Sequence, residues 1–225
     1  MKNKSAKNNS VIVYDFDGTC SPRDSIVKFF KIVLKHKPIK TVVYYLPQVL
    51  TGIALLKLNL ISREMSYWKF RKCFFTEKNL EMFLEEFNRS VKVFDWVKKS
   101  IADDKNIAEK VICITGSPFQ LIQDTAINVL NFDLLFGTRV FVNRRTKNYN
   151  QMIREEKVKQ LYKTFGQNVV LKKMYTDSRD DFPLCRIAEQ VIFVHRDTGQ
   201  QATLTPVEFK KFDDSKKSVV SFFKN

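Results

Sequence analysis

The sequence predicts an α/β fold: a parallel sheet with helices on both faces and an inserted helical segment. Short apolar runs recur along the chain, each run ends in polar residues, and each is followed by a segment whose apolar spacing suits a helix. Strands that alternate with helices are typical of βαβ units, in which the strands lie parallel in one sheet. Because ligands bind beyond the carboxyl ends of such strands, we expect the polar residues after the runs to converge on one edge.

Four apolar runs are the predicted strands: residues 11–14, 111–114, 169–171 with a continuation through 174–175, and 191–194. The predicted helices of this part of the chain are residues 95–109, 119–130, 153–165 and 181–189. Residues 134–149 are expected to form a strand and an extended surface excursion. The first strand ends at Asp15, the second at Thr115 and the third just before Asp177, so these three side chains are expected to meet.

More than eighty residues separate the first two strands, which is too many for an ordinary crossover connection. Helical spacing of apolar residues at 24–36, 64–75 and 78–90 indicates that this insertion is helical. We therefore divide the chain into a disordered N-terminus (1–10), a core domain (11–23 and 93–197), a helical cap (24–92) and a C-terminal extension (198–225). The extension is expected either to pack as a helix on the sheet or to extend a membrane-facing surface.

The composition of the chain indicates which cellular compartment and which classes of binding partner are favoured. The chain has 225 residues, a formal net charge of +15 and four cysteines without metal-binding spacing. These features argue against a disulfide framework or a zinc ribbon and favour a reducing, cytoplasmic location. The positive charge favours polyanionic partners: nucleic acid, an anionic membrane or phosphorylated substrates. Because no nucleic-acid-binding motif accompanies the lysines, nucleic acid is the least favoured of the three.

The residues with candidate chemistry also have simpler interpretations. Asp15 and Asp17 next to a glycine can form a turn. Thr115 can cap the helix that follows it, and Lys157 can be a solvated helix lysine. Taken together, however, carboxylates placed after different strands provide the hard oxygen ligands that suit Mg²⁺, and a lysine beside them would neutralise a phosphate.

Four segments in order carry a family resemblance: Asp15-x-Asp17-Gly-Thr, Thr115-Gly-Ser-Pro, Lys157 in Glu-Glu-Lys-Val-Lys-Gln-Leu, and Asp177-Ser-x-x-Asp181. They resemble the motifs of the haloacid dehalogenase-like hydrolases, in particular the phosphatases with a helical cap between the first two motifs. The resemblance spans residues 11 to about 194. It implies a Rossmann-like core and Mg²⁺-dependent hydrolysis of phosphomonoesters through an aspartyl-phosphate.

The resemblance also implies the roles of the acidic residues. Asp15 would be the nucleophile, and the Asp17 side chain would be the general acid and base. The metal ligands would be Asp15, the backbone carbonyl of Asp17, Asp177 and Asp181. The departures from the common pattern, Thr176 and Cys20, remove no functional side chain.

The phosphate would be held by the remaining motif residues. The Thr115 hydroxyl and the backbone N–H groups around Gly116 would donate hydrogen bonds to phosphoryl oxygens. Lys157 would lie between nucleophile and phosphate and stabilise the developing charge. We choose Lys157 over Lys159 because it begins the helix pattern and matches the family's Lys-Val-x-x-Leu arrangement.

Two groups within this family suggest different substrates. The layout of a basic helix, an apolar Leu-Pro stretch and the later motifs is similar to the phosphatidylglycerophosphatase C group, which implies a lipid phosphate such as phosphatidylglycerophosphate. The alternative is a soluble small-molecule phosphatase similar to phosphoserine phosphatase. Asp24, seven residues after Asp17, occupies the position where that group binds the substrate amine, although Asp24-Ser25 also fits a helix cap. We favour the lipid-type phosphate.

Residues 41–56 contain no charged side chain and lie between Lys40 and Lys57. They are expected to form a buried pair of cap helices or an element at an anionic membrane surface, where the flanking lysines would add affinity. A transmembrane span is disfavoured because Pro47 and Gly52 interrupt a stretch that is already short. A basic membrane-binding or nucleic-acid-binding module without turnover is the alternative from a different functional class. The sequence does not indicate an oligomeric state.

Overall fold

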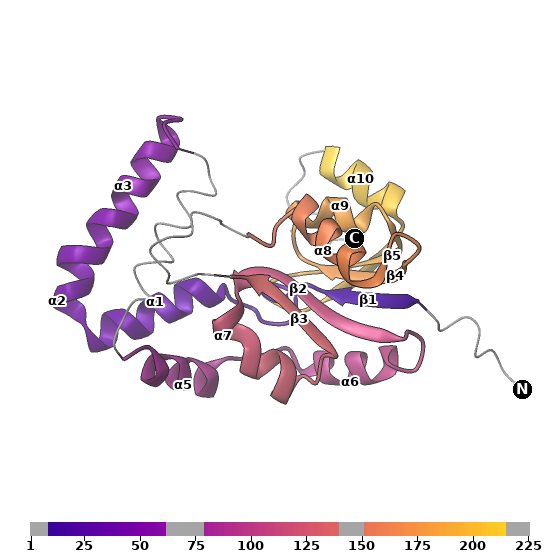
Figure 1. Ribbon diagram of the computed structural model, residues 1–225, viewed down its shortest axis with the longest axis horizontal. Coiled ribbons are helices and arrows are strands. Elements are labelled where there is room, and N and C mark those ends of the chain that lie inside the picture. The colour runs from indigo at the N-terminus through magenta and orange to yellow at the C-terminus, as the bar shows by residue number, and fades with distance from the viewer. Residues whose placement is uncertain (1–8, 62–78, 140–150, 215–225) are drawn as a thin grey trace, which may run out of the picture.

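The computed structural model of the protein describes residues 9–61, 79–139 and 151–214. Within these ranges the core is one six-stranded sheet with the strand order β3-β2-β1-β4-β5-β6 (Figure 1). The strands are β1 (Ser10–Tyr14), β2 (Lys110–Pro118), β3 (Leu134–Thr138), β4 (Val170–Thr176), β5 (Ala188–Val194) and β6 (Gln201–Leu204). All five residues of β1 are buried, as expected for a central strand between β2 and β4.

The sheet confirms the predicted α/β class. Strands β1 to β5 pair in parallel, and Tyr14 at the end of β1 lies beside Cys113 of β2 and Tyr175 of β4. The carboxyl ends of these three strands therefore share one edge. Strand β6 pairs antiparallel with β5 and adds to the predicted sheet. Its four-residue run is too short for a clear alternating pattern in the sequence.

Helices cover both faces of the sheet (Figure 1). One core cluster contains residues from α1 (Ser25–His36), α5 (Leu80–Ser90), α6 (Asp95–Asp104) and α7 (Phe119–Asp124). Helix α7 continues into η2 (Thr125–Val129), which contributes to the same cluster. The other cluster is formed by α8 (Glu155–Phe165), α9 (Phe182–Cys185) and α10 (Pro206–Asp214). The apolar faces of these helices are buried in the two clusters, with α5 packed against α1 and α7, and such tertiary packing is the main source of helical stability in a small domain.

The insertion between β1 and β2 is helical where the structure describes it. Helices α1 and α5 confirm the predicted helices at 24–36 and 78–90, whereas the predicted helix at 64–75 lies outside the described residues. Helix α6 ends at Asp104, five residues earlier than expected. A turn that buries Ala108 connects it to β2.

Residues 41–56 do not form the expected pair of buried helices. They belong to one continuous helix, Pro38–Lys57, made of α2 (Pro38–Lys40), a π-helical turn η1 (Thr41–Tyr45) and α3 (Leu46–Lys57). Pro47 lacks an N–H group, and the wider turn just before it lets the helix pass this position without a break. Only 17% of its most apolar 18-residue window is buried.

Residues 181–189 are not the predicted helix either. The turn η3 (Arg179–Asp181) and the four-residue α9 replace most of it, and β5 begins at Ala188, opposite Leu171 of β4. Backbone groups from residue 188 onward therefore bond to the sheet. The gain of a full ladder of hydrogen bonds along β4 outweighs the helical propensity of this short segment.

Of the two alternatives for the C-terminal extension, its described part packs on the sheet. Helix α10 buries Phe209 completely, and the Phe209 ring lies against Phe182 and Phe193. Together with β6, this helix adds Leu204 and Phe209 to the hydrophobic core. Residues 215–225 lie outside the described residues.

Candidate active site

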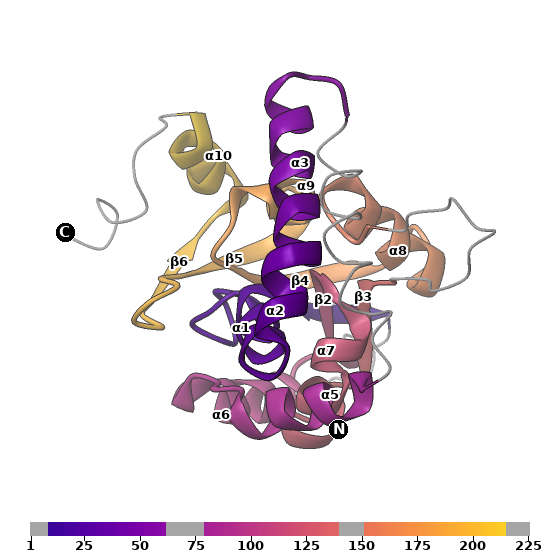
Figure 2. The same cartoon turned by 90° about the vertical axis from the view of Figure 1, so that its left-hand side faces the viewer.

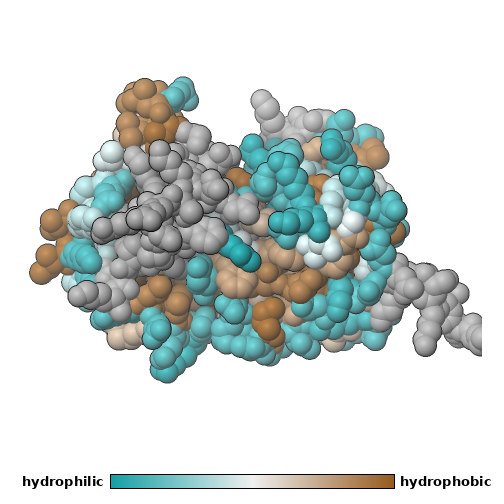
Figure 3. Space-filling view, viewed as in Figure 1, coloured by the Kyte–Doolittle hydropathy of each residue, from teal (hydrophilic) through white to brown (hydrophobic). Residues whose placement is uncertain are grey.

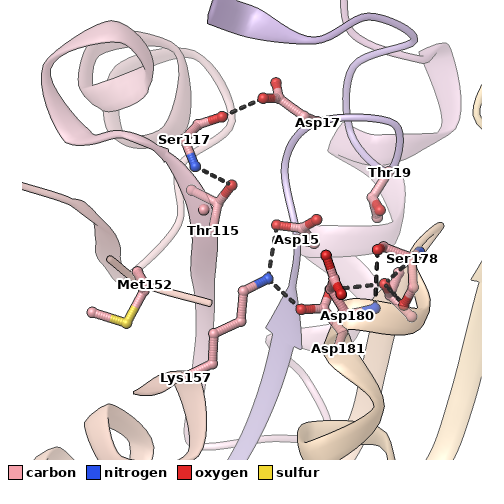
Figure 4. A network of polar contacts seen from close by, with 12 residues as sticks. Asp15, Asp17, Thr19, Thr115, Ser117, Met152, Lys157, Ser178, Asp180 and Asp181 are labelled. Atoms are coloured by element: carbon pink, nitrogen blue, oxygen red, sulfur yellow. Dashed lines mark hydrogen bonds and ion pairs between the residues drawn. The ribbon is translucent and has the colours of Figure 1, made fainter. Parts of the chain in front are cut away.

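The predicted polar residues meet at the carboxyl edge of the central strands (Figure 4). Asp15 and Asp17 follow β1, Thr115 lies near the end of β2, and Asp177 follows β4. Lys157 reaches the same place from α8 on the adjoining face. The parallel topology thus brings together side chains that lie more than 150 residues apart in the sequence.

Lys157 is the centre of the cluster. Its side chain is 3% exposed, and its Nζ lies 3.1 Å from Oδ1 of Asp15 and 2.5 Å from Oδ1 of Asp181. Burial alone would lower the pKa of Lys157, but the two carboxylates outweigh burial and raise it. Lys157 is therefore a permanent cation. Lys159 lies on the exposed side of α8 and pairs with Glu156, so the choice between the two lysines agrees with the geometry.

Asp181 faces this lysine. Its carboxylate also accepts a 2.8 Å hydrogen bond from Thr176 Oγ1, and burial raises its pKa to about 6. Both contacts direct Asp181 toward Lys157 and the end of β4. The expected role of Asp181 as a metal ligand stays a prediction, and in the structure its carboxylate is held between Lys157 and Thr176.

Asp17 turns away from Asp15 and Lys157 (Figure 4). Its Oδ1 accepts hydrogen bonds from the backbone N–H of Ser25, at 3.0 Å, and from the Ser25 hydroxyl, and its Oδ2 accepts one from the Ser117 hydroxyl. Burial, followed by the nearby charge of Asp24, raises the pKa of Asp17 to about 7. A carboxyl group with this pKa can exchange a proton near neutral pH.

Ser25 and Ser117 were not predicted as site residues. Ser117 lies inside the Thr-Gly-Ser-Pro segment and Ser25 follows Asp24, so both could have been found as hydroxyls next to motif residues. Their common partner Asp17 is visible only in three dimensions.

Asp24 caps α1. Its Oδ1 accepts hydrogen bonds from the backbone N–H groups of Ile26 and Val27, at 2.9 and 3.3 Å. The helix-cap interpretation of this residue is therefore confirmed. A contact between Asp24 and a substrate amine stays a prediction.

Gly18 allows the loop after β1 to approach Asp177. Its φ is +80°, and a Cβ at this position would lie 2.1 Å from Oδ2 of Asp177. Asp177 accepts a hydrogen bond from Thr19 Oγ1 at 3.2 Å, and Arg196 Nε lies 3.8 Å away. Burial, with the charge of Asp15 second, raises the pKa of Asp177 to about 7. Glycine is thus required here for two reasons: the backbone conformation and the contact with a carboxylate.

Asp15 and Asp177 are the two carboxylates in the cluster that are best placed to bind a metal ion. Oδ2 of Asp15 accepts no hydrogen bond from the described part of the chain, whereas Oδ1 is held by Lys157. The described residues contain no group of three or more His, Cys, Asp or Glu side chains arranged around a common metal position. Two hard carboxylates suit Mg²⁺, which usually binds one or two carboxylates and completes its shell with water and substrate phosphate.

Thr115 and Gly116 line the opposite side of the cluster. Thr115 is buried, and its Oγ1 accepts a 3.2 Å hydrogen bond from the backbone N–H of Ser117, which leaves the hydroxyl proton available to a ligand. Gly116 is fixed through its carbonyl, which accepts a 2.7 Å hydrogen bond from Thr138 Oγ1. These contacts hold the strand end rigid beside Asp15.

Replacing Lys157 by methionine should strongly destabilise the protein. The change leaves the buried carboxylates of Asp15 and Asp181 without their cation, for which we expect a loss of about 3–5 kcal/mol in the free energy of unfolding. Because burial already raises the pKa of Asp181 to about 6, the loss should be larger at about pH 8, where Asp181 is ionised, than at about pH 5, where it is largely protonated.

Urea denaturation at both pH values measures this difference. Lys159→Met is the matched control, since it removes an exposed lysine from the same helix and should change stability by no more than about 0.5 kcal/mol. Equal losses in the two variants would contradict the proposed importance of the buried pair.

Comparisons with known proteins agree with this arrangement. No curated protein matches the sequence. A protein of unknown function from Bordetella pertussis Tohama I has a similar structure, with 15% identity and a TM-score of 0.69 over 84% of this chain and 91% of that chain. A phosphoserine phosphohydrolase-like protein from Francisella tularensis subsp. tularensis SCHU S4 is similar at 19% identity and a TM-score of 0.56, over 84% and 87%.

A further similar structure is a phospho-aspartyl intermediate analogue of phosphoserine phosphatase, with 16% identity and a TM-score of 0.57 over 91% of each chain. Identities this low show a common fold. The family itself is shown by residues 12–186, which match the haloacid dehalogenase-like hydrolases. The match covers most of the chain and includes every residue of the cluster, and the protein therefore belongs to the haloacid dehalogenase-like hydrolase family.

Proposed function

We propose that the protein is a Mg²⁺-dependent phosphomonoester hydrolase that acts through an aspartyl-phosphate on Asp15. The observation that carries this proposal is the geometry of Asp15, whose Oδ1 is held by Lys157 while Oδ2 accepts no hydrogen bond from the described residues. One oxygen is thereby neutralised and oriented, and the other is available to attack phosphorus. The similar fold of a phosphoserine phosphatase phospho-aspartyl analogue supports the same chemistry.

The residues divide the reaction between them. Oδ2 of Asp15 forms a bond to phosphorus while the bond to the leaving oxygen breaks, and Asp17 gives its proton to that oxygen. Asp17 then takes a proton from the water that attacks the aspartyl-phosphate, which releases phosphate and restores Asp15. Lys157 and Thr115 bind the phosphoryl oxygens throughout, and the charge of Lys157 offsets the charge that develops on them.

Asp15, Asp177 and the Asp17 carbonyl are the proposed ligands of Mg²⁺, with Asp181 as a further predicted ligand. Bound there, the ion would neutralise the negative charge of the substrate phosphate, which otherwise repels an anionic nucleophile. Asp177 suits this role because its carboxylate lies near Asp15 and its pKa is raised to about 7, as expected for a buried carboxylate that lacks a strong cationic partner.

A lipid-type phosphate is the substrate that we favour. The helix Pro38–Lys57 is long and apolar enough to cross a membrane by length and composition, yet its apolar side chains are largely in contact with solvent. Ile39, Val43 and Leu50 are 80%, 71% and 55% exposed. Figure 3 shows this hydrophobic surface at both ends of the helix, at the left edge and the upper left of the view.

Such a surface on a helix with lysines at both ends fits the headgroup and acyl region of an anionic bilayer. We propose that this helix, as part of a cap formed by residues 24–92, holds the enzyme against the cytoplasmic face of a membrane. The phosphate of a lipid such as phosphatidylglycerophosphate would then reach Asp15. The predicted closeness to the phosphatidylglycerophosphatase C group stays part of this proposal.

The second candidate is a soluble small-molecule phosphatase. It is favoured by the fold shared with a phosphoserine phosphatase and by the position of Asp24. In the structure, however, Asp24 uses its Oδ1 to cap α1, so its proposed contact with a substrate amine has to rely on the other oxygen.

Replacing Asp15 by asparagine should abolish turnover. We expect the hydrolysis of p-nitrophenyl phosphate in the presence of Mg²⁺ to fall about a thousandfold or more, because the amide has no anionic oxygen to attack phosphorus. Removing divalent cations with a chelator should abolish wild-type turnover, and adding Mg²⁺ should restore it.

The control for this prediction is Asp180→Asn, which changes an exposed carboxylate paired with Arg154 and should keep wild-type turnover. Equal activity of Asp15→Asn and the wild type would rule out Asp15 as the nucleophile. A set of lipid, amino-acid, sugar and nucleotide phosphates extends the test. If neither the wild type nor Asp15→Asn releases phosphate from any of them, a binding module without turnover is favoured.

Replacing Asp24 by asparagine should shift the pH dependence of kcat/KM. Formation of the aspartyl-phosphate requires protonated Asp17, so kcat/KM should fall as the pH rises past the Asp17 pKa of about 7. The charge of Asp24 raises that pKa, and asparagine removes the charge but still caps a helix. The alkaline limb should therefore move to lower pH. An unchanged limb, or the same shift in the control Asp95→Asn at the exposed start of α6, would contradict the role of Asp17.

Replacing Leu50 and Ile53 together by serine should weaken membrane binding. Both side chains are exposed on α3, at 55% and 44%, and each would lose the free energy of transfer into the bilayer. We expect the affinity for vesicles that contain anionic phospholipid to fall about tenfold or more in co-sedimentation. The matched control replaces Ile107 and Val207, which are 44% and 64% exposed elsewhere. Equal binding by both double variants would contradict the proposed membrane helix.

A further inference from the structure

A pocket beside the candidate active site is lined by residues around the start of α1 and by residues of the turn that follows β5. Figure 2 shows where α1, β5 and β6 lie. The pocket has a volume of about 820 Å³, within the usual range for small-molecule sites. We call it the basic pocket. Its lining residues are Ser21, Pro22, Arg23, Asp24, Val27, Lys28, Lys31, Lys92, Arg196 and Asp197.

The cations of the basic pocket come from three separate parts of the chain. Lys28 and Lys31 follow Asp24 and Val27 at helical spacing, so one face of α1 points into the pocket. Lys92 lies in the connection between α5 and α6, and Arg196 lies just after β5. The fold therefore gathers five cationic side chains around one cavity that holds only two carboxylates.

These charges are poorly balanced by the protein. Within the described residues, Arg23, Lys31 and Lys92 form no ion pair, and the Asp24 carboxylate is occupied by the N-terminus of α1. The pKa of Lys28 is lowered by burial and then by the like charges of Arg23 and Lys92. Repulsion among neighbouring cations around a cavity favours the binding of an anion.

The basic pocket adjoins the catalytic cluster on two sides. Arg196 lines the pocket and its Nε lies 3.8 Å from Oδ2 of Asp177. On the other side Asp24 precedes Ser25, whose hydroxyl and N–H bind Asp17. A ligand with its phosphomonoester at Asp15 can therefore extend toward the pocket past either Asp177 or Asp17.

From this juxtaposition we infer that the basic pocket binds a second anionic group of the substrate. The inference rests on the proposed phosphatase function and narrows it. The preferred substrate carries, besides the phosphomonoester that is hydrolysed, a phosphate or phosphodiester that is not. Arg23, Lys28, Lys31, Lys92 and Arg196 bind this second group and are specificity residues that take no part in the bond-breaking steps.

A series of alkanediol phosphates tests the inference. Each diol, from three to eight carbons long, is compared as its monophosphate and its bisphosphate, which differ only in the second phosphate. For the spacer that matches the distance between the sites, wild-type kcat/KM should favour the bisphosphate. The ratio of the two kcat/KM values should fall about three- to tenfold in the double variant Lys31→Gln/Lys92→Gln, since exposed charge pairs are individually weak. Raising the salt concentration should reduce the wild-type ratio in the same direction.

The matched control is Lys98→Gln/Lys110→Gln, which removes two exposed lysines outside the pocket and should keep the wild-type ratio. A ratio that falls equally in both variants would mean that net charge alone attracts the bisphosphate, and it would overturn the inference. An unchanged ratio in the pocket variant, with weaker binding to anionic vesicles, would assign these lysines to membrane lipid and would also overturn it.

Binding to the inactive protein separates this inference from the proposed function. Calorimetry with Asp15→Asn should show tighter binding of the bisphosphate than of the monophosphate, and the Lys31→Gln/Lys92→Gln changes in that background should remove the difference. If the wild type hydrolyses no phosphomonoester but this difference is present, the proposed function fails and the anion site stands. If turnover is normal and the difference is absent, the inference fails alone.

Discussion

The buried cation of Lys157 is the interaction on which the rest of the site depends. It lies between Asp15 and Asp181 at the carboxyl edge of the sheet, where three strands end in carboxylates or hydroxyls. Without it, several acidic groups would be buried together, and their mutual repulsion and lost hydration would oppose folding. With it, one oxygen of Asp15 is held in a fixed orientation, while burial raises the pKa values of Asp17 and Asp177 to about 7. Under the proposed function, these chemically similar carboxylates would act as a nucleophile, a proton carrier and a metal ligand.

The fold brings the carboxylates into one cluster but orients Asp15 and Asp17 in different directions. Asp17 is bound by Ser25 at the start of α1 and by Ser117 at the end of β2, which turns it away from Asp15. Gly18 lets the loop that follows β1 lie directly against the Asp177 carboxylate. Under the proposed mechanism, attack and proton transfer would therefore come from two side chains only two residues apart. Catalysis by such a site would rely on preorganised positions more than on movement of the residues that the structure describes.

Much of the fold and of the site could be predicted from the sequence, and the errors have physical causes. The apolar runs before Asp15, Thr115 and Asp177 identified the strands because central parallel strands are buried on both faces. Residues 181–189 were predicted as a helix because local propensity cannot reveal that β4 offers hydrogen bonds to β5 from Ala188 onward. For residues 41–56 the sequence left a buried and a membrane-facing position open, since an apolar stretch has the same pattern in a core and at a membrane, and the structure leaves most of this helix exposed. The partners of Asp17 and the orientation of Asp181 depend on contacts between distant segments, which no local pattern contains.

Two features beside the candidate active site, the exposed apolar helix and the basic pocket, bear on which substrate the protein would bind. The exposed apolar helix follows α1 directly, and the basic pocket uses the face of α1 that begins at Asp24, so one continuous segment would both contact a bilayer and bind an anionic headgroup. The claim on which all of this depends is that Asp15 carries the phosphoryl group. The most direct measurement quenches the enzyme with acid during turnover of a ³²P-labelled phosphomonoester and maps the label by peptide analysis. We expect Mg²⁺-dependent label on the Asp15 carboxylate, whereas label on another residue, or turnover without any labelled enzyme, would rule out Asp15 as the nucleophile.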